Sequence, residues 1–426
     1  MKTVLVICPT ERDYREIDRT LLSKKYNVLF HSWDKISFDQ LILPDETVGI
    51  EGPEPSVHIA DLTEFCSDRK VDAVVSSDDY PGSILASFVA QKCDLIGSSP
   101  EAVLTCHHKY YARCNQARHT PDATPHFMLI DALGKSTGSC HVAFPFFVKP
   151  VKASFSVYAR QINSADELKH YVGYAHLPDA YLSYFNYGLN QYDSFEYDGH
   201  YFLAEDILEG FQVTVEGFVY NGVITVLGIV DSIMFPGTIS FARFEYPSRL
   251  PSSIQEAMAS VVKQAICGIG LDNTMFNVEC IYNDQIGTIH IIEINSRMSS
   301  QFADLFEKVD GINSYEIMFD LALGKQPTVS FRQGSYDVAA SCVLRMFEDK
   351  YVASLPSEIQ LNKVFELFPD IRIELCAQEG KRLSSLKQDE YSYRYGLINL
   401  GGHDWDDLFA KYRRSLDMLE FVFEPL

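Results

Sequence analysis

The chain has 426 residues, and its content of 46% hydrophobic and 22% charged residues is ordinary for a globular protein and argues against disorder. Its net charge of −22 argues against a nucleic-acid partner, whose phosphates would be repelled, although a few lysines in a cleft would still hold a nucleotide. No apolar run reaches the roughly 18 residues that a membrane span needs, so we expect no membrane partner.

The ten cysteines lack Cys-x-x-Cys pairs and zinc-like spacing, so we expect reduced thiols in a cytoplasmic protein. The apolar stretch at the N-terminus is too short for a signal peptide and is typical of a first strand. At roughly 150 residues per domain, the length indicates about three domains.

The first hundred residues alternate short apolar strands with helical stretches. We expect strands at 3–7, 28–30, 73–76 and 95–97, and helices at 14–25, 59–68 and 84–92. This rhythm predicts a small parallel sheet with helices on its faces. No Gly-x-Gly-x-x-Gly follows the first strand, so the sequence does not favour a dinucleotide site there.

A second region begins with the Pro-Phe-Phe-Val-Lys-Pro strand, and a third begins near residue 335. The second region is predicted to contain strands at 145–150, 153–157, 201–206, 213–220 and 223–230, and helices at 165–174, 251–268 and 314–323. Asn221-Gly222 is a strong signal for a two-residue hairpin turn. The third region is predicted to be a separate small α/β unit with strands at 339–345 and 371–375 and a helix at 405–419.

Residues 275–282 and 288–297 are predicted to be the arms of one β-hairpin, joined by the turn residues Asn-Asp-Gln-Ile-Gly. Pairing about this turn places Glu279 almost opposite Glu293, and the period of two places Asn277 beside Glu279 and Asn295 beside Glu293. Like charges across a strand pair destabilise it, whereas a divalent cation removes that cost, and an Asn oxygen completes a ligand set of the Mg²⁺ type. The alternative is a solvated strand face with two carboxylates.

These segments, in this order, resemble an ATP-grasp ligase of the carboxylate–amine, amino-acid ligase-like branch, and the resemblance runs over nearly the whole chain. It implies an ATP-grasp fold of the α/β and α+β class. The expected domains are an N-terminal parallel α/β domain (1–115), an ATP-grasp domain (116–335, with subdomains of about 116–200 and 201–335) and a small C-terminal α/β domain (336–426).

The resemblance assigns several residues to ATP. Lys149 is similar to a strand lysine that reaches the α-phosphate, and an otherwise apolar strand would bury a lysine only at a cost unless an anion is present. Lys109 is similar to the family's other nucleotide lysine, although by itself it could be any lysine on a helix surface. Lys152, Ser154 and Ser156 stand in the phosphate-covering loop, which is rich in glycine in many members and has none here.

Residues 202–210 resemble the hinge between the two subdomains. There Glu205, Asp206 and the backbone through Leu208 would meet the adenine edge, while Ile207 and Leu208 pack on its face. The alternative is an edge strand with polar ends. Gln212 stands at the ribose position, where the family usually has Glu.

The resemblance also implies that Glu279, Glu293 and Asn295 bind Mg²⁺ (or Mn²⁺) and that Arg297 steadies an acyl phosphate and a tetrahedral intermediate. The alternative for Arg297 is a surface pair with Glu307 or Asp304. Glu216 matches an acidic residue near the metals or the substrate. In the long connection 231–248, Arg243 could meet a substrate carboxylate and Glu245 an amine, and structural packing is an equally good interpretation of both.

The function implied is ATP-dependent joining of a small-molecule carboxylate and an amine, with ATP and Mg²⁺ as cofactors and a homodimer by family analogy. Met298-Ser-Ser-Gln301 replaces the usual Pro-Gly-Gly-like loop, so the substrates are not identified. Two alternatives stay open: a biotin-carboxylase-like enzyme that uses bicarbonate, and a nucleotide-binding protein without catalysis.

Overall fold

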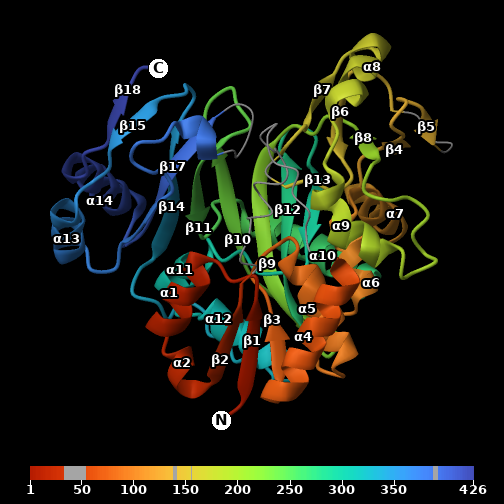
Figure 1. Cartoon of the computed structure of the whole chain (residues 1–426). Coiled ribbons are helices and arrows are strands. Elements are labelled where there is room, and N and C mark those ends of the chain that lie inside the picture. Colours follow the sequence, from red (N-terminus) through yellow and green to blue (C-terminus); the bar gives the residue numbers. More distant parts are fainter. Residues whose placement is uncertain (33–53, 138–141, 155, 387–391) are drawn as a thin grey trace.

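The computed structural model describes residues 1–32, 54–137, 142–154, 156–386 and 392–426. Within these residues the strands form four sheets, of three, five, eight and two strands. In Figure 1 the three-stranded sheet lies at the bottom, the eight-stranded sheet occupies the centre, and the five-stranded sheet lies at the upper right. No helix of the described ranges is long and apolar enough to cross a membrane.

The three-stranded sheet has the order β2-β1-β3, and both of its pairings are parallel, as predicted. Its strands are short and rich in branched apolar residues, and β1 and β3 are fully buried. The elements of this unit are β1 (Thr3–Ile7), α1 (Glu11–Arg19), α2 (Leu22–Lys25), β2 (Asn27–His31), α4 (Pro55–Arg69), β3 (Ala73–Val75), α5 (Gly82–Lys92), α6 (Pro100–His107) and α7 (Lys109–His119).

Two predictions for this unit are wrong. The helix expected at 14–25 is divided into α1 and α2, because Leu21 has a left-handed backbone with a φ of 59°. The strand expected at 95–97 is not formed. Asp94, with a φ of 55°, turns the chain out of α5, and the N–H of Leu95 donates back to the carbonyl of Ala90.

The five-stranded sheet has the order β5-β4-β8-β6-β7, with β8 in its centre. β8 carries the predicted hinge and pairs with both β4 and β6, so the alternative that this segment is an edge strand is wrong. The elements are the 3₁₀ turn Pro121–Ala123, β4 (Phe127–Ile130), β5 (Ser136–Thr137), β6 (Phe146–Pro150), β7 (Arg160–Ile162), α8 (Ala165–Tyr174), α9 (Asp179–Leu189) and β8 (Phe202–Glu205).

The prediction of a strand at 153–157 is also wrong. Strand β6 ends at Pro150, and the described residues that follow form bends and turns. Ser156 and Tyr158 have φ values of 56° and 59°, which belong to the left-handed region and are incompatible with a strand. Phe155 lies outside the described residues.

The eight-stranded sheet has the order β13-β12-β9-β10-β11-β14-β17-β16, and all of its pairings are antiparallel. The predicted Asn221-Gly222 turn joins β9 to β10, with φ values of 48° and 76° at its two residues. The strands are β9 (Phe211–Tyr220), β10 (Val223–Met234), β11 (Phe241–Tyr246), β12 (Thr274–Asn283), β13 (Thr288–Asn295), β14 (Val338–Met346), β16 (Arg372–Leu375) and β17 (Tyr393–Gly402).

The two faces of this sheet are covered by different helices. Val213, Val215 and Val278 pack in one core with α10 (Ser252–Ile269), whose Met258 and Val262 are fully buried. The opposite face carries Phe218 and Met275, which belong to a second core. That second core includes residues of α11 (Ala303–Asp310) and α12 (Ser314–Ala322). The second face also carries the predicted metal ligands.

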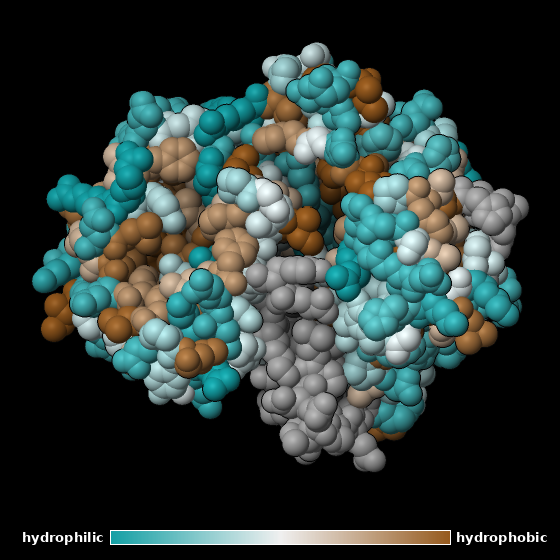
Figure 2. All heavy atoms as spheres, turned by 90° about the horizontal axis from the view of Figure 1, so that it is seen from above, coloured by the Kyte–Doolittle hydropathy of each residue, from teal (hydrophilic) through white to brown (hydrophobic). Residues whose placement is uncertain are grey.

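Strands β14, β17 and β16 extend the sheet past residue 335, so the C-terminal region shares a sheet with the region before it. The domain limits stay predictions. The remaining elements are β15 (Tyr351–Ser354), α13 (Glu358–Leu367), the 3₁₀ turn Leu383–Leu386, α14 (Trp405–Met418) and β18 (Val422–Glu424). Seen from above, the surface is hollowed between the C-terminal elements on the left and the five-stranded sheet on the right (Figure 2).

Candidate active site

The predicted hairpin is formed by β12 and β13 in the expected register. Glu279 lies directly opposite Glu293, and Asn277 lies opposite Asn295. The turn is closed by the N–H of Gly287, which donates to the carbonyl of Asn283 at 2.8 Å. Phe276, Val278 and Cys280 are buried on the other face, so the hydrophobic pattern fixes which side chains face the site.

A β-bulge follows the facing carboxylates, because Cys280 pairs with Ile291 and leaves Ile292 as an extra residue. The freed carbonyl of Ile292 accepts a hydrogen bond from Arg113 Nη2 at 2.9 Å. Arg113 comes from α7 of the N-terminal unit. The bulge therefore fixes the position of the hairpin relative to that unit.

The facing glutamates do not ionise alike. Burial raises the pKa of Glu279 to about 7, and the neighbouring charge of Glu293 adds to this. Burial also raises the pKa of Glu293, but Lys109, whose Nζ lies 3.0 Å from Glu293 Oε1, and Lys149 together outweigh it, and the net shift is downward. Gln212 donates to Glu279 Oε2 at 3.0 Å.

This donor set fits one hard divalent cation. Two facing carboxylates raise each other's cost of ionisation, which a bound cation would relieve, and the amide of Asn295 lies beside them on the same strand face. Within the described ranges no group of three or more His, Cys, Asp or Glu side chains is arranged for a metal ion. The fit therefore rests on the two glutamates and an amide oxygen of Asn295.

Lys149 is held by a buried cluster around Glu205. Its Nζ lies 2.6 Å from Glu205 Oε1, and Arg113 Nε donates to Glu205 Oε2 at 2.9 Å. Burial raises the pKa of the Glu205 carboxyl, but Arg113 and Lys149 outweigh it, so that pKa lies below its ordinary value. The Glu205 side chain is thus occupied by two cations, and the N–H of Asp206 that follows it donates to the carbonyl of His126 at 3.1 Å.

The rest of the hinge is more open. Asp206 pairs with His126 at the start of β4, with Oδ2 2.8 Å from Nδ1 and 3.1 Å from the backbone nitrogen. Ile207 and Leu208 are half-buried. These two apolar side chains follow the central strand β8 directly.

A second charged cluster surrounds Asp79, which the sequence did not single out. Its Oδ1 lies 3.1 Å from Arg297 Nη2, and its Oδ2 lies 3.4 Å from Lys152 Nζ. Lys152 Nζ lies 2.8 Å from His107 Nδ1. Burial raises the pKa of the Asp79 carboxyl, but Lys152 and Arg297 outweigh it and hold that pKa far below its ordinary value.

Arg297 is therefore not the surface arginine of the alternative interpretation. Glu307, one of the proposed partners, pairs with Arg19, and Asp304, the other, pairs with Lys308. Arg297 also donates from Nη1 to the carbonyl of Met298 at 3.4 Å.

Glu216 connects the hairpin to the loop after Arg297. Its Oε2 accepts from Asn277 Nδ2 and its Oε1 accepts from the N–H of Ser299, both at 2.7 Å. Asn295 Nδ2 lies 3.4 Å from Asn277 Oδ1, so this series of hydrogen bonds reaches Asn295, a predicted metal ligand. Glu216 is 1% exposed, and this burial raises its pKa to about 7.

The two serines of the predicted phosphate-covering loop differ in burial. Ser154 is half-buried, with its Oγ 3.5 Å from the hydroxyl of Tyr181, whereas Ser156 is exposed. Lys109 donates to the carbonyl of Ala153 at 3.0 Å, so the same lysine touches both the loop and Glu293.

Arg243 and Glu245 do not join these clusters. In the strand register Glu245 lies opposite Asp231, and Asp231 lies opposite Val213. The side chains of Glu245 and Arg243 therefore lie on the face of the sheet that α10 covers, and Glu279 lies on the other face. Arg243 Nε donates to Glu245 at 2.6 Å, and its guanidinium lies 5.1 Å from the ring centroid of Phe409. Arg249 also pairs with Glu245 at 2.8 Å. The geometry therefore favours the packing interpretation for both residues.

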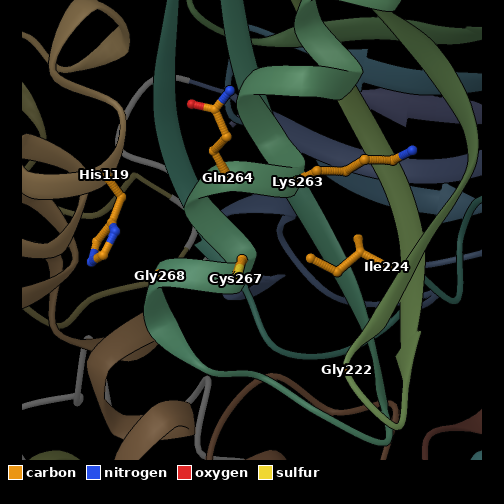
Figure 3. Close-up of a pocket in the computed structure, with 7 residues that line it drawn as sticks. All are labelled: His119, Gly222, Ile224, Lys263, Gln264, Cys267 and Gly268. Carbon is orange, nitrogen blue, oxygen red and sulfur yellow. The ribbon is translucent and has the colours of Figure 1, made fainter.

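A cavity of about 560 Å³ lies elsewhere on the molecule, between the ends of α7 and α10 and the β9–β10 turn (Figure 3). His119 faces the C-terminal end of α10 in this view, opposite Gly268 and Cys267. The lining includes none of the predicted site residues, and it belongs to the face covered by α10.

Sequence reasoning missed Asp79, His107 and Arg113. A signal for Asp79 was present, because Ser-Ser-Asp-Asp directly follows the third parallel strand, and ligand sites lie at the carboxyl ends of such strands. His107 and Arg113 stand within or at the ends of helices, and the sequence gives no sign that His107 contacts Lys152 or that Arg113 contacts the hairpin.

Residues 142–305 match the sequence family described as the ATP-grasp domain. No curated protein sequence matches the chain. Among solved structures, an L-amino acid ligase from Bacillus licheniformis is similar, with a TM-score of 0.75 and 16% identity, over 100% of this chain and 99% of that one. Phosphoribosylglycinamide synthetase from Anaerococcus prevotii has a TM-score of 0.67 and 18% identity, over 99% and 100% of the two chains.

A third similar structure is the biotin carboxylase domain dimer of 2-oxoglutarate carboxylase from Hydrogenobacter thermophilus, in complex with MgADP, ADP and bicarbonate. Its TM-score is 0.66 at 14% identity, over 99% of this chain and 91% of that one. The predicted fold class is confirmed by these structures. Residues 142–305 therefore contain an ATP-grasp domain, and the chain as a whole has the fold of these solved structures.

Proposed function

We propose that this protein is an ATP- and Mg²⁺-dependent carboxylate–amine ligase that acts on small molecules of the amino-acid class. The observation that carries the proposal is the direct opposition of Glu279 and Glu293, within the field of Lys109, Lys149 and Arg297. A sheet gains nothing from two facing carboxylates, whereas phosphoryl transfer needs such a pair to hold a divalent cation.

In the proposed reaction a substrate carboxylate attacks the γ-phosphate of ATP, which gives ADP and an acyl phosphate. An amine then displaces the phosphate and forms the amide. Glu279, Glu293 and Asn295 would hold Mg²⁺ (or Mn²⁺), which neutralises charge on the phosphates when it is bound. The protein's own contribution is mainly positioning and charge compensation.

The nucleotide would lie along the groups that the two halves of the chain bring together. Lys149, oriented by Glu205, and Lys109 would bind phosphates, with the hydroxyls of Ser154 and Ser156 nearby. Ile207 and Leu208 would pack on the adenine, and the hinge backbone from Asp206 onward would hydrogen-bond its edge. Gln212 would reach the ribose side.

Arg297 is the proposed catalytic residue, because an arginine offers several N–H donors in a fixed plane to a developing anion. Glu216 would position the loop that carries Ser299 and, through Asn277, the amide of Asn295. The amino-acid class of substrate is supported by the similarity to the L-amino acid ligase.

A carboxylating enzyme is the second candidate, favoured by the similarity to the biotin carboxylase domain. A nucleotide-binding protein without catalysis is the third. Retention of Glu279, Glu293, Asn295 and Arg297 argues against the third, because facing carboxylates cost stability when no cation is needed.

The test is ADP release from the purified protein with Mg²⁺-ATP, across mixtures of amino acids with and without bicarbonate. ADP release that requires two organic substrates supports the ligase. ADP release that follows bicarbonate alone replaces the ligase with the carboxylating enzyme. Binding of ATP without ADP release under any mixture would contradict the proposed catalysis on amino acids.

Three further proposals accompany this function. The domain limits are 1–115, 116–335 and 336–426, which limited proteolysis would test. The protein is cytoplasmic, which fractionation of its native cells would test. A homodimer is supported by the dimeric biotin carboxylase domain among the similar structures, and the molar mass in solution would test it.

A further inference from the structure

The phosphate-loop resemblance gave Lys152 a role in ATP binding, but its surroundings point elsewhere. Lys152 is 2% exposed, and its Nζ lies 2.8 Å from His107 Nδ1 and 3.4 Å from Asp79 Oδ2. The same nitrogen lies 4.6 Å from the ring centroid of Tyr80. All three of these groups belong to the N-terminal unit.

Lys149 provides the contrast, since it stands three residues earlier and is also buried. Its Nζ is directed to Glu205 on the hinge strand β8. Strand β6 ends at Pro150, and after that point the chain no longer alternates its side chains as a strand does. The two lysines therefore serve different carboxylates from different parts of the chain.

The hydrogen bonds around His107 allow only one assignment of donors and acceptors. Ser83 Oγ donates its single proton to the carbonyl of Asp79 at 2.5 Å, so it can only accept from His107 Nε2, which lies 2.8 Å away. His107 Nδ1 then carries the lone pair and accepts from Lys152 Nζ. The imidazole is neutral in this arrangement, and Lys152 is a donor.

Asp79 is thereby held at two points. Ser83 binds its backbone carbonyl, and Lys152 faces its carboxylate. The other carboxylate oxygen lies 3.1 Å from Arg297 Nη2. Since the contacts of Arg297 with Asp79 and Met298 use only Nη1 and Nη2, the guanidinium keeps further N–H donors for an anion.

The charges of this cluster also favour an anion beside Arg297. Lys152 and Arg297 carry two positive charges against the one negative charge of Asp79, while His107 is neutral. The site therefore has a local positive surplus in a chain whose net charge is −22. A positive surplus at Arg297 suits an anionic reacting group.

We propose that Lys152 is a positioning residue for Arg297, acting through Asp79, and that it is not a ligand of the ATP phosphates. The role of Arg297 rests on the proposed function, whereas the orientation of Lys152 does not. Without the Lys152 charge, Asp79 would turn more freely and Arg297 would lose its fixed plane. A misplacement of the order of 1 Å near a reacting centre costs about 10²-fold in rate.

The first experiment measures nucleotide binding without turnover. Isothermal titration with the non-hydrolysable ATP analogue AMP-PNP and Mg²⁺ compares Lys149→Met, Lys152→Met and Lys411→Met, the last being a matched control on α14 that pairs with Asp407. We expect Lys149→Met to weaken binding about tenfold, the value of one lost charge-assisted contact, and the other two variants to stay within about twofold of the wild type. Equal weakening by Lys149→Met and Lys152→Met would overturn the proposal.

The second experiment uses the amino-acid mixture that gives ADP release. We expect Lys152→Met and Asp79→Asn each to lower kcat by about 10²-fold, with KM for ATP within about twofold of the wild type. The double variant should be no slower than the slower single variant, because the two residues act through one contact. Multiplied losses, or a rise of KM for ATP, would contradict the role.

Failure of the proposed function and failure of the proposed role of Lys152 give different results. If the wild type binds AMP-PNP but no mixture gives ADP release, the proposed function fails, and the titration alone still decides where Lys152 acts. If Lys152→Met unfolds, as its thermal midpoint would reveal, Asp79→Asn carries the kcat and KM comparison by itself.

Discussion

Two carboxylates organise the candidate site, and they differ in how far each is closed to water. Glu205 and its partners Lys149 and Arg113 are sealed, and the side chain of Glu205 is 4% exposed. Asp79 is 24% exposed and its partner Arg297 is 20% exposed. The first cluster is therefore a fixed internal support, whereas the second is open to water at Arg297, although its Lys152 and His107 are buried.

The difference follows from where the chain supplies the charges. Glu205 ends the central strand of its sheet, and Lys149 lies on the neighbouring strand β6, so backbone pairing places them together. Asp79, His107, Lys152 and Arg297 come from four separate loops or helix ends. A cluster built at such ends stays at the edge of its elements, where side chains are open to a cleft.

Removal of a proposed metal ligand gives the largest expected effect. Glu293→Ala should abolish ADP release from Mg²⁺-ATP, a loss on the order of 10³-fold or more, because the facing carboxylate alone cannot hold the cation. Circular dichroism and the thermal midpoint should show that the fold survives.

Glu366→Ala is the control for Glu293→Ala, since Glu366 is an exposed glutamate on α13 and is not one of the proposed site residues. It should release ADP at the wild-type rate. Unchanged ADP release in Glu293→Ala would disprove the metal assignment.

The sealed cluster should respond to a neutral substitution through stability. Glu205→Gln leaves Lys149 and Arg113 buried without a counter-charge, and breaking a buried pair in this way costs about 3–5 kcal/mol of unfolding free energy. Urea unfolding should give a smaller loss for Asp79→Asn, because water still reaches Arg297, one of its two charged partners. Glu348→Gln, at an exposed pair with Lys350, is the control and should cause no measurable change. Equal losses in the first two variants would remove the distinction between the clusters.

The hairpin was predictable because its signals are local. Alternation with a period of two fixes that Glu279 and Asn277 share a face, and the turn residues fix the register that sets Glu279 against Glu293. The order of the segments along the chain was enough to predict the fold. Each of these segments is recognised from residues within a few positions of one another, and only their order depends on the whole chain.

The Asp79 cluster was not predictable for the opposite reason. Nothing in the sequence near Lys152 shows that its side chain leaves the strand direction after Pro150, and left-handed backbone at Ser156 and Tyr158 overrides the strand-like pattern of this loop. The pairing of Lys152 with His107 arises only when two distant segments pack. Side-chain direction after the end of an element is a tertiary property.

The pH dependence of stability probes Glu216, the buried carboxyl of β9 that lies beside Asn277 of the hairpin. Burial raises the pKa of Glu216 from 4.5 to about 7 in the folded protein, so the folded state binds more protons than the unfolded state between these values. Stability should therefore be lost as pH rises through this window, by up to about 3 kcal/mol from this one group.

The difference between wild type and Glu216→Gln isolates that contribution, because Gln cannot ionise. Urea unfolding at pH 5 and pH 8 should show the variant gaining stability relative to the wild type at the higher pH. A constant difference between the two proteins would mean that Glu216 is not held in a raised-pKa state by its surroundings.

The smallest of the four effects tests the open cluster through the shape of its cation. Arg297→Lys keeps the positive charge near Asp79 but removes the planar fork, so a single ammonium must choose between Asp79 and an incoming anion. We expect kcat for ADP release to fall by about 10²-fold while AMP-PNP binding is unchanged, since in the proposed site the nucleotide is bound by Lys149 and Lys109. Arg19→Lys is the matched control, because Arg19 on α1 forms an ion pair with Glu307 on α11. If Arg297→Lys weakened AMP-PNP binding instead, Arg297 would belong with the nucleotide, and the division of the site between Glu205 and Asp79 would be wrong.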